Sequence, residues 1–258
     1  MTYRYLAPSL FVAVLLLLST LVTTASADEF LALRGGYQLL SPQGSIAGSA
    51  SGVDRKIDVK RELDLDDSES LTGEISLQWG RTRLSLNYLP ISFSGTGTLK
   101  ASGSFNNQEF IADEEVRTEL DIALYDIGFT YYLVNLDNLP VRFQLGPELA
   151  VKIADTEAMF RTFDSNINET ASALVPIPTV GVRGRIGLAD FIGISGRVGY
   201  MEVDSNSFLD AEAQLEYSPL PLVGFYAGYR YFDLKIDDSD IYVETDFSGP
   251  FGGLLVRF

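Results

Sequence analysis

The sequence predicts an all-β fold in which about ten antiparallel strands close into an up-and-down barrel, with eight strands as the alternative. Three observations support this prediction. Apolar and polar residues alternate with a period of two along most of the 258-residue chain, which is the spacing of a strand with one apolar face. Tyr and Phe are abundant, with 13 and 16 copies, and 23 Gly residues suit turns. Short turns alternate with longer polar connections, as between the strands of a meander.

The alternation predicts where each strand lies along the chain. The fifth, at 141–153, is the cleanest, because apolar residues occupy every second position from Val141 to Ile153. Pro90 interrupts the phase of the third strand, which predicts a bulge or a kink. The phase is ambiguous near Leu124 to Asp126, and this leaves the eight-strand alternative open. The predicted strands span residues 31–39, 71–79, 83–89, 116–133, 141–153, 180–187, 192–200, 209–217, 223–236 and 241–258.

The connections between these strands are of two kinds. Short turns are predicted at 80–81, 135–138, 189–190 and 218–221. Polar loops are predicted at 41–70, 94–115 and 154–171, with short acidic connections at 204–207 and 237–240. Short turns at one end and longer loops at the other are typical of a membrane barrel whose termini both lie at the turn end.

The last strand explains why the sheet should close. Leu254, Val256 and Phe258 alternate around Arg257, and an open apolar edge of this kind would aggregate. Closure removes every edge, and a closed barrel is the only sheet that can stand in lipid. The ending GPFGGLLVRF (249–258) and the segment AGYRYFD (227–233) resemble small bacterial outer-membrane barrels of the OmpA-like and OmpW-like class.

This resemblance implies a place in the outer membrane of a Gram-negative bacterium, in contact with lipid and lipopolysaccharide. It also implies that Leu254, Val256 and Phe258 form the assembly signal that the barrel-assembly machinery reads. A secreted β-sandwich or lipocalin-like barrel is the soluble alternative, and it would place apolar side chains inside. The apolar face instead carries aromatic residues at strand ends, as in the girdles of a membrane barrel. These are Trp79, Tyr88, Tyr131, Tyr200 and Tyr217.

The amino terminus predicts export. Residues 1–27 have a basic start at Arg4, an apolar core and a small-residue cleavage site at Ala25-Ser26-Ala27, which are the parts of a signal peptide. An uncleaved membrane anchor is the alternative. The barrel domain is therefore expected to span residues 28–258, without a separate periplasmic domain.

The polar face of the strands is expected to line the lumen. Buried charges are costly unless they are paired, and Arg can pair bidentately with carboxylates. We expect an ion-pair network that fills a narrow barrel, with an Arg-lined channel for small polar or anionic solutes as the alternative. The predicted lumen residues are Arg34, Glu74, Arg83, Arg142, Glu148, Lys152, Arg183, Arg185, Arg197, Asp210, Glu212, Glu216 and Arg230.

The composition excludes several functions. A net charge of −16 argues against nucleic-acid binding, and the absence of Cys excludes disulfides and thiolate metal sites. The chain also has no His, the side chain best suited to proton transfer near neutral pH. Known outer-membrane barrel enzymes are similar to one another in using His. We therefore expect no catalytic residues, no cofactor and no resident metal.

Acidic residues concentrate in the predicted loops, at Asp64, Asp66, Asp67 and Glu69, at Asp113, Glu114 and Glu115, and at Asp237, Asp238 and Asp240. They predict a solvated surface, with weak divalent-cation bridges to lipid head groups as the alternative. The sequence as a whole predicts a non-enzymatic barrel with a structural or surface-interaction role. The alternative is a narrow passive channel.

Overall fold

The computed structural model describes residues 30–48, 57–98, 103–105, 108–110, 115–136, 141–163, 168–238 and 241–258. The predicted signal peptide, residues 1–27, and the start of the predicted domain at residue 28 lie outside the described residues. The acidic residues Asp113, Glu114 and Asp240 also lie outside them. Within the described part, no helix has the length and apolarity needed to cross a bilayer.

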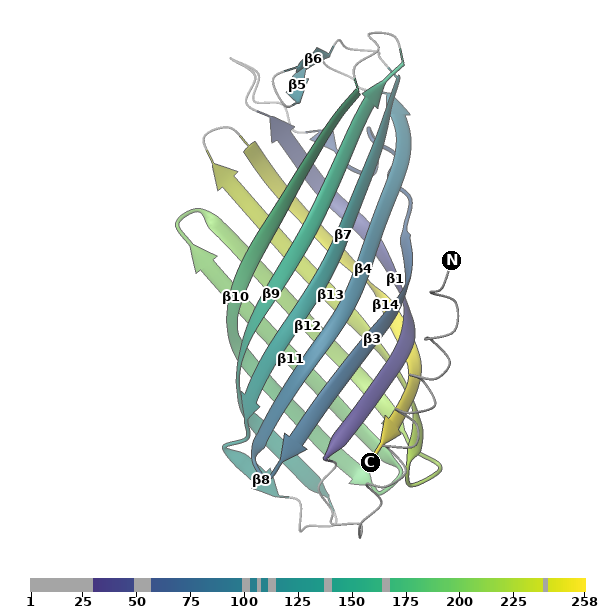
Figure 1. Cartoon of the computed structure of the whole chain (residues 1–258), viewed down its shortest axis with the longest axis vertical. Coiled ribbons are helices and arrows are strands. Elements are labelled where there is room, and N and C mark those ends of the chain that lie inside the picture. Colours follow the sequence, from purple (N-terminus) through teal and green to yellow (C-terminus); the bar gives the residue numbers. More distant parts are fainter. Residues whose placement is uncertain are drawn as a thin grey trace, which may run out of the picture.

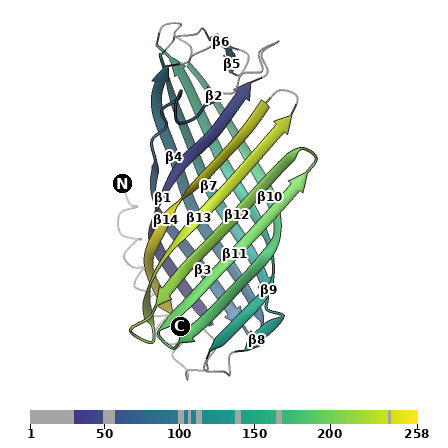
Figure 2. The same ribbon diagram turned by 180° about the vertical axis from the view of Figure 1, so that it is seen from behind.

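Ten long antiparallel strands form one closed barrel, so the ten-strand prediction is confirmed and the eight-strand alternative is wrong. Each strand pairs with its neighbours along the chain, and the last pairs with the first, from Ala32–Arg257 to Gly48–Ile241. Figures 1 and 2 show the tilted barrel from its two sides. The strands are β1 (Leu31–Gly48), β3 (Ser68–Trp79), β4 (Thr82–Thr98), β7 (Glu115–Tyr131), β9 (Arg142–Thr162), β10 (Asn168–Ala189), β11 (Ile192–Val203), β12 (Asn206–Tyr217), β13 (Val223–Asp238) and β14 (Ile241–Arg257).

Four short strands complete the described sheets: β2 (Ile57–Asp58), β5 (Gly103–Phe105), β6 (Gln108–Phe110) and β8 (Val134–Leu136). The carboxy terminus and β8 lie at one end of the barrel, which we call the turn end, and β5 and β6 lie at the opposite loop end (Figure 1). At the turn end, Gly80 has a φ of 56°, a conformation that a glycine adopts without steric cost.

The strands reach further toward the loop end than predicted. The polar loop predicted at 154–171 is wrong, because β9 continues to Thr162 and β10 begins at Asn168, and the two are paired throughout this extension. Similarly, β1 runs to Gly48 and β4 to Thr98. These strand extensions stand in water, so their outward residues are polar. Composition alone does not distinguish such residues from those of a loop.

Pro90 does not end its strand. It pairs with Ala123 in the β4–β7 ladder, whereas the ladder between β3 and β4 stops at Gly73–Tyr88. A proline has no amide hydrogen to donate, so it is tolerated where one side of a strand has no ladder. The interruption predicted at Pro90 is therefore a break in pairing with β3.

The outer face of the membrane-spanning part is apolar, as predicted. Leu149 and Val180 are 56% and 65% exposed, and the five predicted girdle aromatics are each between 42% and 46% exposed. Tyr88 and Tyr125 form a ring pair on this face, with centroids 5.1 Å apart. Apolar side chains that point outward from a closed barrel can only be covered by lipid.

The polarity of the two faces inverts toward the loop end. On β4, Ile91 and Phe93 point into the barrel and are buried, whereas Ser92 between them is exposed. On β9, Ala154 is buried and Asp155 is exposed. This part of the barrel is therefore built like a water-soluble one, with an apolar core of Leu40, Val59, Leu63, Leu65, Leu89, Ile91, Phe93, Val116, Leu124, Ala154, Phe160, Ile177, Phe208, Phe232 and Phe247.

One segment of the first loop folds into this core. In residues 59–67, which we call the plug segment, Val59, Leu63 and Leu65 are no more than 4% exposed. The segment approaches β4 so closely that a Cβ atom on Gly97 would overlap the carbonyl oxygen of Glu62. The loop end of the barrel is thus filled by side chains from its own strands and from this segment.

Candidate functional site

A four-residue cluster of charges lies at the centre of the lumen. The Lys152 ammonium is 2.8 Å from Asp126 Oδ2 and 2.6 Å from Asp210 Oδ2. Arg197 reaches the same two oxygens, with Nη1 at 2.6 Å from Asp126 and Nη2 at 3.0 Å from Asp210. The four side chains come from β9, β7, β12 and β11, and none is more than 4% exposed. Each carboxylate therefore has two cationic partners in a site without water access.

Two further carboxylates extend this cluster toward β9 and β3. Glu148 accepts hydrogen bonds from Arg183 Nε and, at 2.8 Å, from the Thr130 hydroxyl. Glu74 pairs with Arg34 and, at 2.6 Å, with Arg83. Charge-assisted hydrogen bonds of this kind offset the cost of removing the groups from water.

Arg230 joins the charged layer to aromatic side chains. It pairs with Glu212, which also lies 3.5 Å from Arg197 Nε. Its guanidinium carbon is 5.6 Å from the ring centroid of Phe232 and 5.5 Å from that of Phe251. Because Phe232 belongs to the apolar core, the ionic layer and the apolar core are in direct contact.

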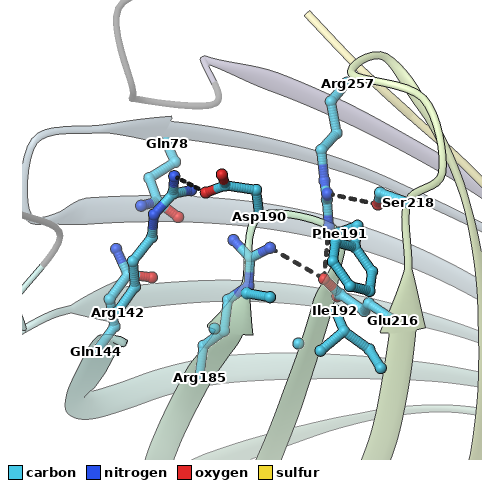
Figure 3. Close-up of a pocket in the computed structure, with 13 residues that line it drawn as sticks. Gln78, Arg142, Gln144, Arg185, Asp190, Phe191, Ile192, Glu216, Ser218 and Arg257 are labelled. Carbon is cyan, nitrogen blue, oxygen red and sulfur yellow. Dashed lines mark hydrogen bonds and ion pairs between the residues drawn. The ribbon is translucent and has the colours of Figure 1, made fainter. Parts of the chain in front are cut away.

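Glu216 forms ion pairs with three arginines at the turn end. Its oxygens lie 2.8 Å from Arg34 Nη2, 3.1 Å from Arg185 Nη2 and 2.5 Å from Arg257 Nη2. Figure 3 shows Arg185 and Arg257 converging on Glu216 at a small recess of about 50 Å³. Arg257 also donates to the Ser218 hydroxyl at 2.9 Å. The Glu216 carboxylate, at which the recess ends, is therefore already paired with arginines of the protein.

No protein-family model and no curated protein sequence matches the chain. Solved structures do. The outer-membrane protease OmpT of Escherichia coli is similar with a TM-score of 0.57 and 12% identity, over 92% of this chain and 99% of OmpT. Ail of Yersinia pestis matches over 88% of this chain and 99% of its own, with a TM-score of 0.37 and 10% identity. OprG of Pseudomonas aeruginosa matches over 88% and 95%, with a TM-score of 0.30 and 13% identity.

The chain is an outer-membrane β-barrel. The fold shared with OmpT, the apolar outer face and the charged lumen together place it in the outer membrane of a Gram-negative bacterium. In such barrels the short turns face the periplasm and the longer loops face outward. The turn end is accordingly periplasmic and the loop end extracellular.

The structure brings all the predicted lumen residues except Arg142 into the network around Asp126, Glu74 and Glu216. Arg142 lies instead at the periplasmic rim, where it pairs with Asp190 at 3.0 Å and is 46% exposed. Among the described residues, two charged members of the network, Asp126 and Arg257, were not predicted. Asp126 lay in the strand segment of ambiguous phase, and Arg257 was read only as the polar partner of Val256 and Phe258. Counting inward positions back from Thr130 would have found Asp126.

The predicted assembly residues lie where the barrel closes. The amide of Phe258 donates to the carbonyl of Leu31 at 2.8 Å, and the amide of Leu31 donates back to the carbonyl of Phe258 at 3.3 Å. Leu254 is 53% exposed and Phe258 38% exposed. Leu254 and Phe258 thus add to the lipid-facing surface at the closing seam.

Asp58 and Asp67 of the first loop have partners in the protein. Asp67 pairs with Lys60 at 3.1 Å, and Asp58 caps the turn that follows it by accepting from the amide of Arg61 at 2.8 Å. Hydrogen bonding from Lys60 holds the pKa of Asp67 below its ordinary range. Among the described residues, no group of three or more His, Cys, Asp or Glu side chains is placed to hold a metal ion.

Proposed function

We propose that this outer-membrane barrel is a non-enzymatic and non-conducting protein with a structural role in the envelope or an interaction role at the cell surface. The observation that carries this proposal is the filled lumen. A passage from the periplasm would have to cross the buried Asp126–Lys152–Asp210–Arg197 cluster and then the apolar core around Phe93 and Phe247.

Neither layer is suited to carry ions. The charged groups neutralise one another instead of facing water, and separating them would leave uncompensated buried charges. The apolar layer offers no polar group to replace the hydration shell of a solute. A barrel of about eight strands has an interior that side chains fill, whereas open aqueous pores need roughly sixteen strands. With ten strands, this barrel is close in size to the eight-stranded barrels whose interiors are filled by side chains.

Planar lipid bilayers test this proposal. Purified protein inserted into a bilayer is expected to give no stepwise current, while a porin in the same apparatus gives clear steps. Insertion must be verified independently, for example by protease protection of the protein in liposomes of the same lipid. Stable single-channel steps from inserted wild-type protein would contradict the proposal.

A narrow passage for small polar or anionic solutes is the second candidate. The observation that favours it is the periplasmic recess lined by Arg142, Arg185 and Arg257, which would attract anions. This candidate predicts conductance steps with anion preference. The preference should be lost when Arg183 and Arg185 are both replaced by Ala.

Catalysis is not expected, although OmpT, which shares the fold, is a protease. The chain has no His, and the lumen carboxylates Asp126, Glu148 and Glu216 each accept from cationic donors that hold them as structural anions. Purified protein should turn over neither peptides nor phospholipids above the rate of a detergent blank. Turnover that copurifies with the folded barrel would contradict this assignment.

The surface features of the barrel support proposals about its partners. The apolar exterior would contact outer-membrane lipid and lipopolysaccharide, and the closing strand with Leu254, Val256 and Phe258 would engage the barrel-assembly machinery during insertion. Carboxylates on the extracellular extension, such as Asp155 and Glu157, would present a negative surface to any partner outside the cell. Weak divalent-cation bridges to lipid head groups remain part of this proposal.

A further inference from the structure

The wall of the barrel has a break in strand pairing between β3 and β4. The ladder between them stops at Gly73–Tyr88, although β3 reaches Ser68 and β4 reaches Thr98. Along this stretch the described contacts are single hydrogen bonds. The amide of Ser92 donates to the Ser68 hydroxyl at 2.9 Å, and the amide of Asp66 donates to the carbonyl of Ser94 at 2.8 Å.

A hollow of about 380 Å³ lies at this break, on the outer side of the wall. Its floor is apolar. Pro90 and Ala123 face each other across the β4–β7 ladder and form this floor, whereas the neighbouring Ile91 and Ile122 border the hollow but pack against the apolar core inside the barrel. This volume is in the lower range of small-molecule pockets.

The hollow opens at the level of the lipid head groups. Tyr88 and Tyr125, whose rings form a tilted pair on the outer face, are the next outward residues toward the membrane on the same two strands. Aromatic girdles mark the boundary between hydrocarbon and head groups. A molecule in the hollow would therefore have lipid on one side and water on the other.

Carboxylates line the rim of the hollow: Glu69, Asp121, Asp155 and Glu157. Two of them accept hydrogen bonds from hydroxyls, Glu69 from Tyr37 and Asp121 from Ser92. Within the described part of the chain, no Lys or Arg forms an ion pair with any of the four. The first-loop carboxylate Asp67 differs, because it has Lys60 as its partner.

We propose that this hollow binds a single-chain amphiphile with a cationic head group. The alkyl chain would lie on the floor of Pro90 and Ala123, and the head group would lie among the four carboxylates. The apolar hollow would hold the alkyl chain, and the carboxylates of the rim would favour a positively charged head group. A bare metal ion is a poorer fit, since these carboxylates are not grouped as a metal site. The inference rests on the outer wall and is independent of whether the lumen conducts.

The test uses the full barrel in nanodiscs of zwitterionic lipid and a photoreactive alkyltrimethylammonium probe. After illumination, mass spectrometry maps the labelled peptides. Label is expected on the β4 and β7 peptides around Pro90 and Ala123, and unlabelled dodecyltrimethylammonium should displace it. A photoreactive alkyl sulfate with the same chain should label this position weakly.

Two kinds of variant complete the test, each checked for folding by circular dichroism. Ala123→Trp fills the hollow and should abolish specific label, whereas Ala213→Trp, at an outward alanine of β12, should leave it unchanged. Combined Asp121→Asn, Asp155→Asn and Glu157→Gln should reduce label about tenfold, from three exposed ion pairs. The control Glu202→Gln should not. Uniform label around the barrel, equal labelling by the sulfate probe, or insensitivity to these variants would overturn the proposal.

Discussion

Lys152 of β9 and Asp210 of β12 meet inside the barrel, with Nζ 2.6 Å from Oδ2, although β10 and β11 lie between their strands. The same ammonium lies 2.8 Å from Asp126 of β7, on the other side of β9. One lysine therefore ties β12 to the paired strands β7 and β9, although no backbone ladder connects β12 to either of them. Cross-lumen contacts of this kind oppose any change in the barrel's cross-section.

Replacing Lys152 by Met should destabilise the barrel by about 3–5 kcal/mol, because Asp126 and Asp210 would be left buried with Arg197 as their shared cation. Urea unfolding in detergent micelles measures the change. Arg142→Met, which breaks the exposed rim pair with Asp190, should cost less than about 1 kcal/mol. Adding Asp210→Asn to Lys152→Met should recover part of the loss. Equal costs for the two single variants would refute the buried-network assignment.

The apolar core near the extracellular end makes a separate prediction. Phe93 and Phe247 stack with ring centroids 5.1 Å apart and an interplanar angle of 20°. Phe93→Ala should destabilise the barrel by about 3–5 kcal/mol, through lost burial and the cavity left behind. Phe129→Ala, on the lipid-facing surface, should cost clearly less, since detergent or lipid fills the space. A double-mutant cycle of Phe93 and Phe247 should give a coupling of about 0.5–1.5 kcal/mol.

The plug segment depends on a close backbone approach. Because a Cβ on Gly97 would overlap the carbonyl oxygen of Glu62, Gly97→Ala should displace residues 59–67 from the core. Hydrogen exchange at the amides of Leu65 and Asp66, which are bonded to Val59 and Ser94, should become faster. Gly35→Ala is the matched control, as a Cβ there meets no atom within 4 Å. Unchanged protection in Gly97→Ala would show that the segment is not held by this contact.

Acid should loosen the same segment. Lys60 donates to Asp67 at 3.1 Å and to the carbonyl of Leu65 at 2.8 Å, and this hydrogen bonding lowers the pKa of Asp67 from its ordinary 3.8. A carboxylate with a depressed pKa in the folded state contributes stability that is present above its unfolded pKa and is lost as the pH falls through the folded value. NMR titration of the Asp67 carboxyl should give a pKa below 3.8. In Lys60→Met it should move upward, toward the ordinary value.

The alternation of the sequence was sufficient to predict a barrel of about ten strands, with eight as the alternative, because lipid demands apolar residues on every outward position between the girdles. It failed where the solvent outside the barrel changes from lipid to water. At Leu89 to Phe93 and at Ala154 to Asp155 the alternation continues, but the apolar face turns inward. A single rule for the whole strand therefore misread an extended, water-exposed part of the barrel as loops, and it missed the apolar core.

The lumen charges illustrate a different limit. Lys152, Arg197 and Asp210 were identified as lumen candidates because they alternate with the apolar residues of their strands. Charged residues are too costly on the face that contacts lipid. The pairing of Lys152 with Asp210 could not be predicted, because which strands meet across a lumen depends on barrel diameter and stagger. Neighbour-strand reasoning would match Arg183 with Glu148, which is correct, but would not connect Lys152 to Asp210.

The closing strand carries the last prediction. Phe258 exchanges two backbone hydrogen bonds with Leu31 and presents its ring outward at the closing seam. If Leu254, Val256 and Phe258 form the assembly signal, Phe258→Ala should slow insertion in cells while leaving the stability of the folded barrel nearly unchanged, because the backbone bonds persist. Pulse-chase measurement of the folded fraction separates the two effects. Phe225→Ala, at another outward aromatic position of the neighbouring strand β13, should change assembly much less, and equal delays would point to lost lipid contact instead of recognition.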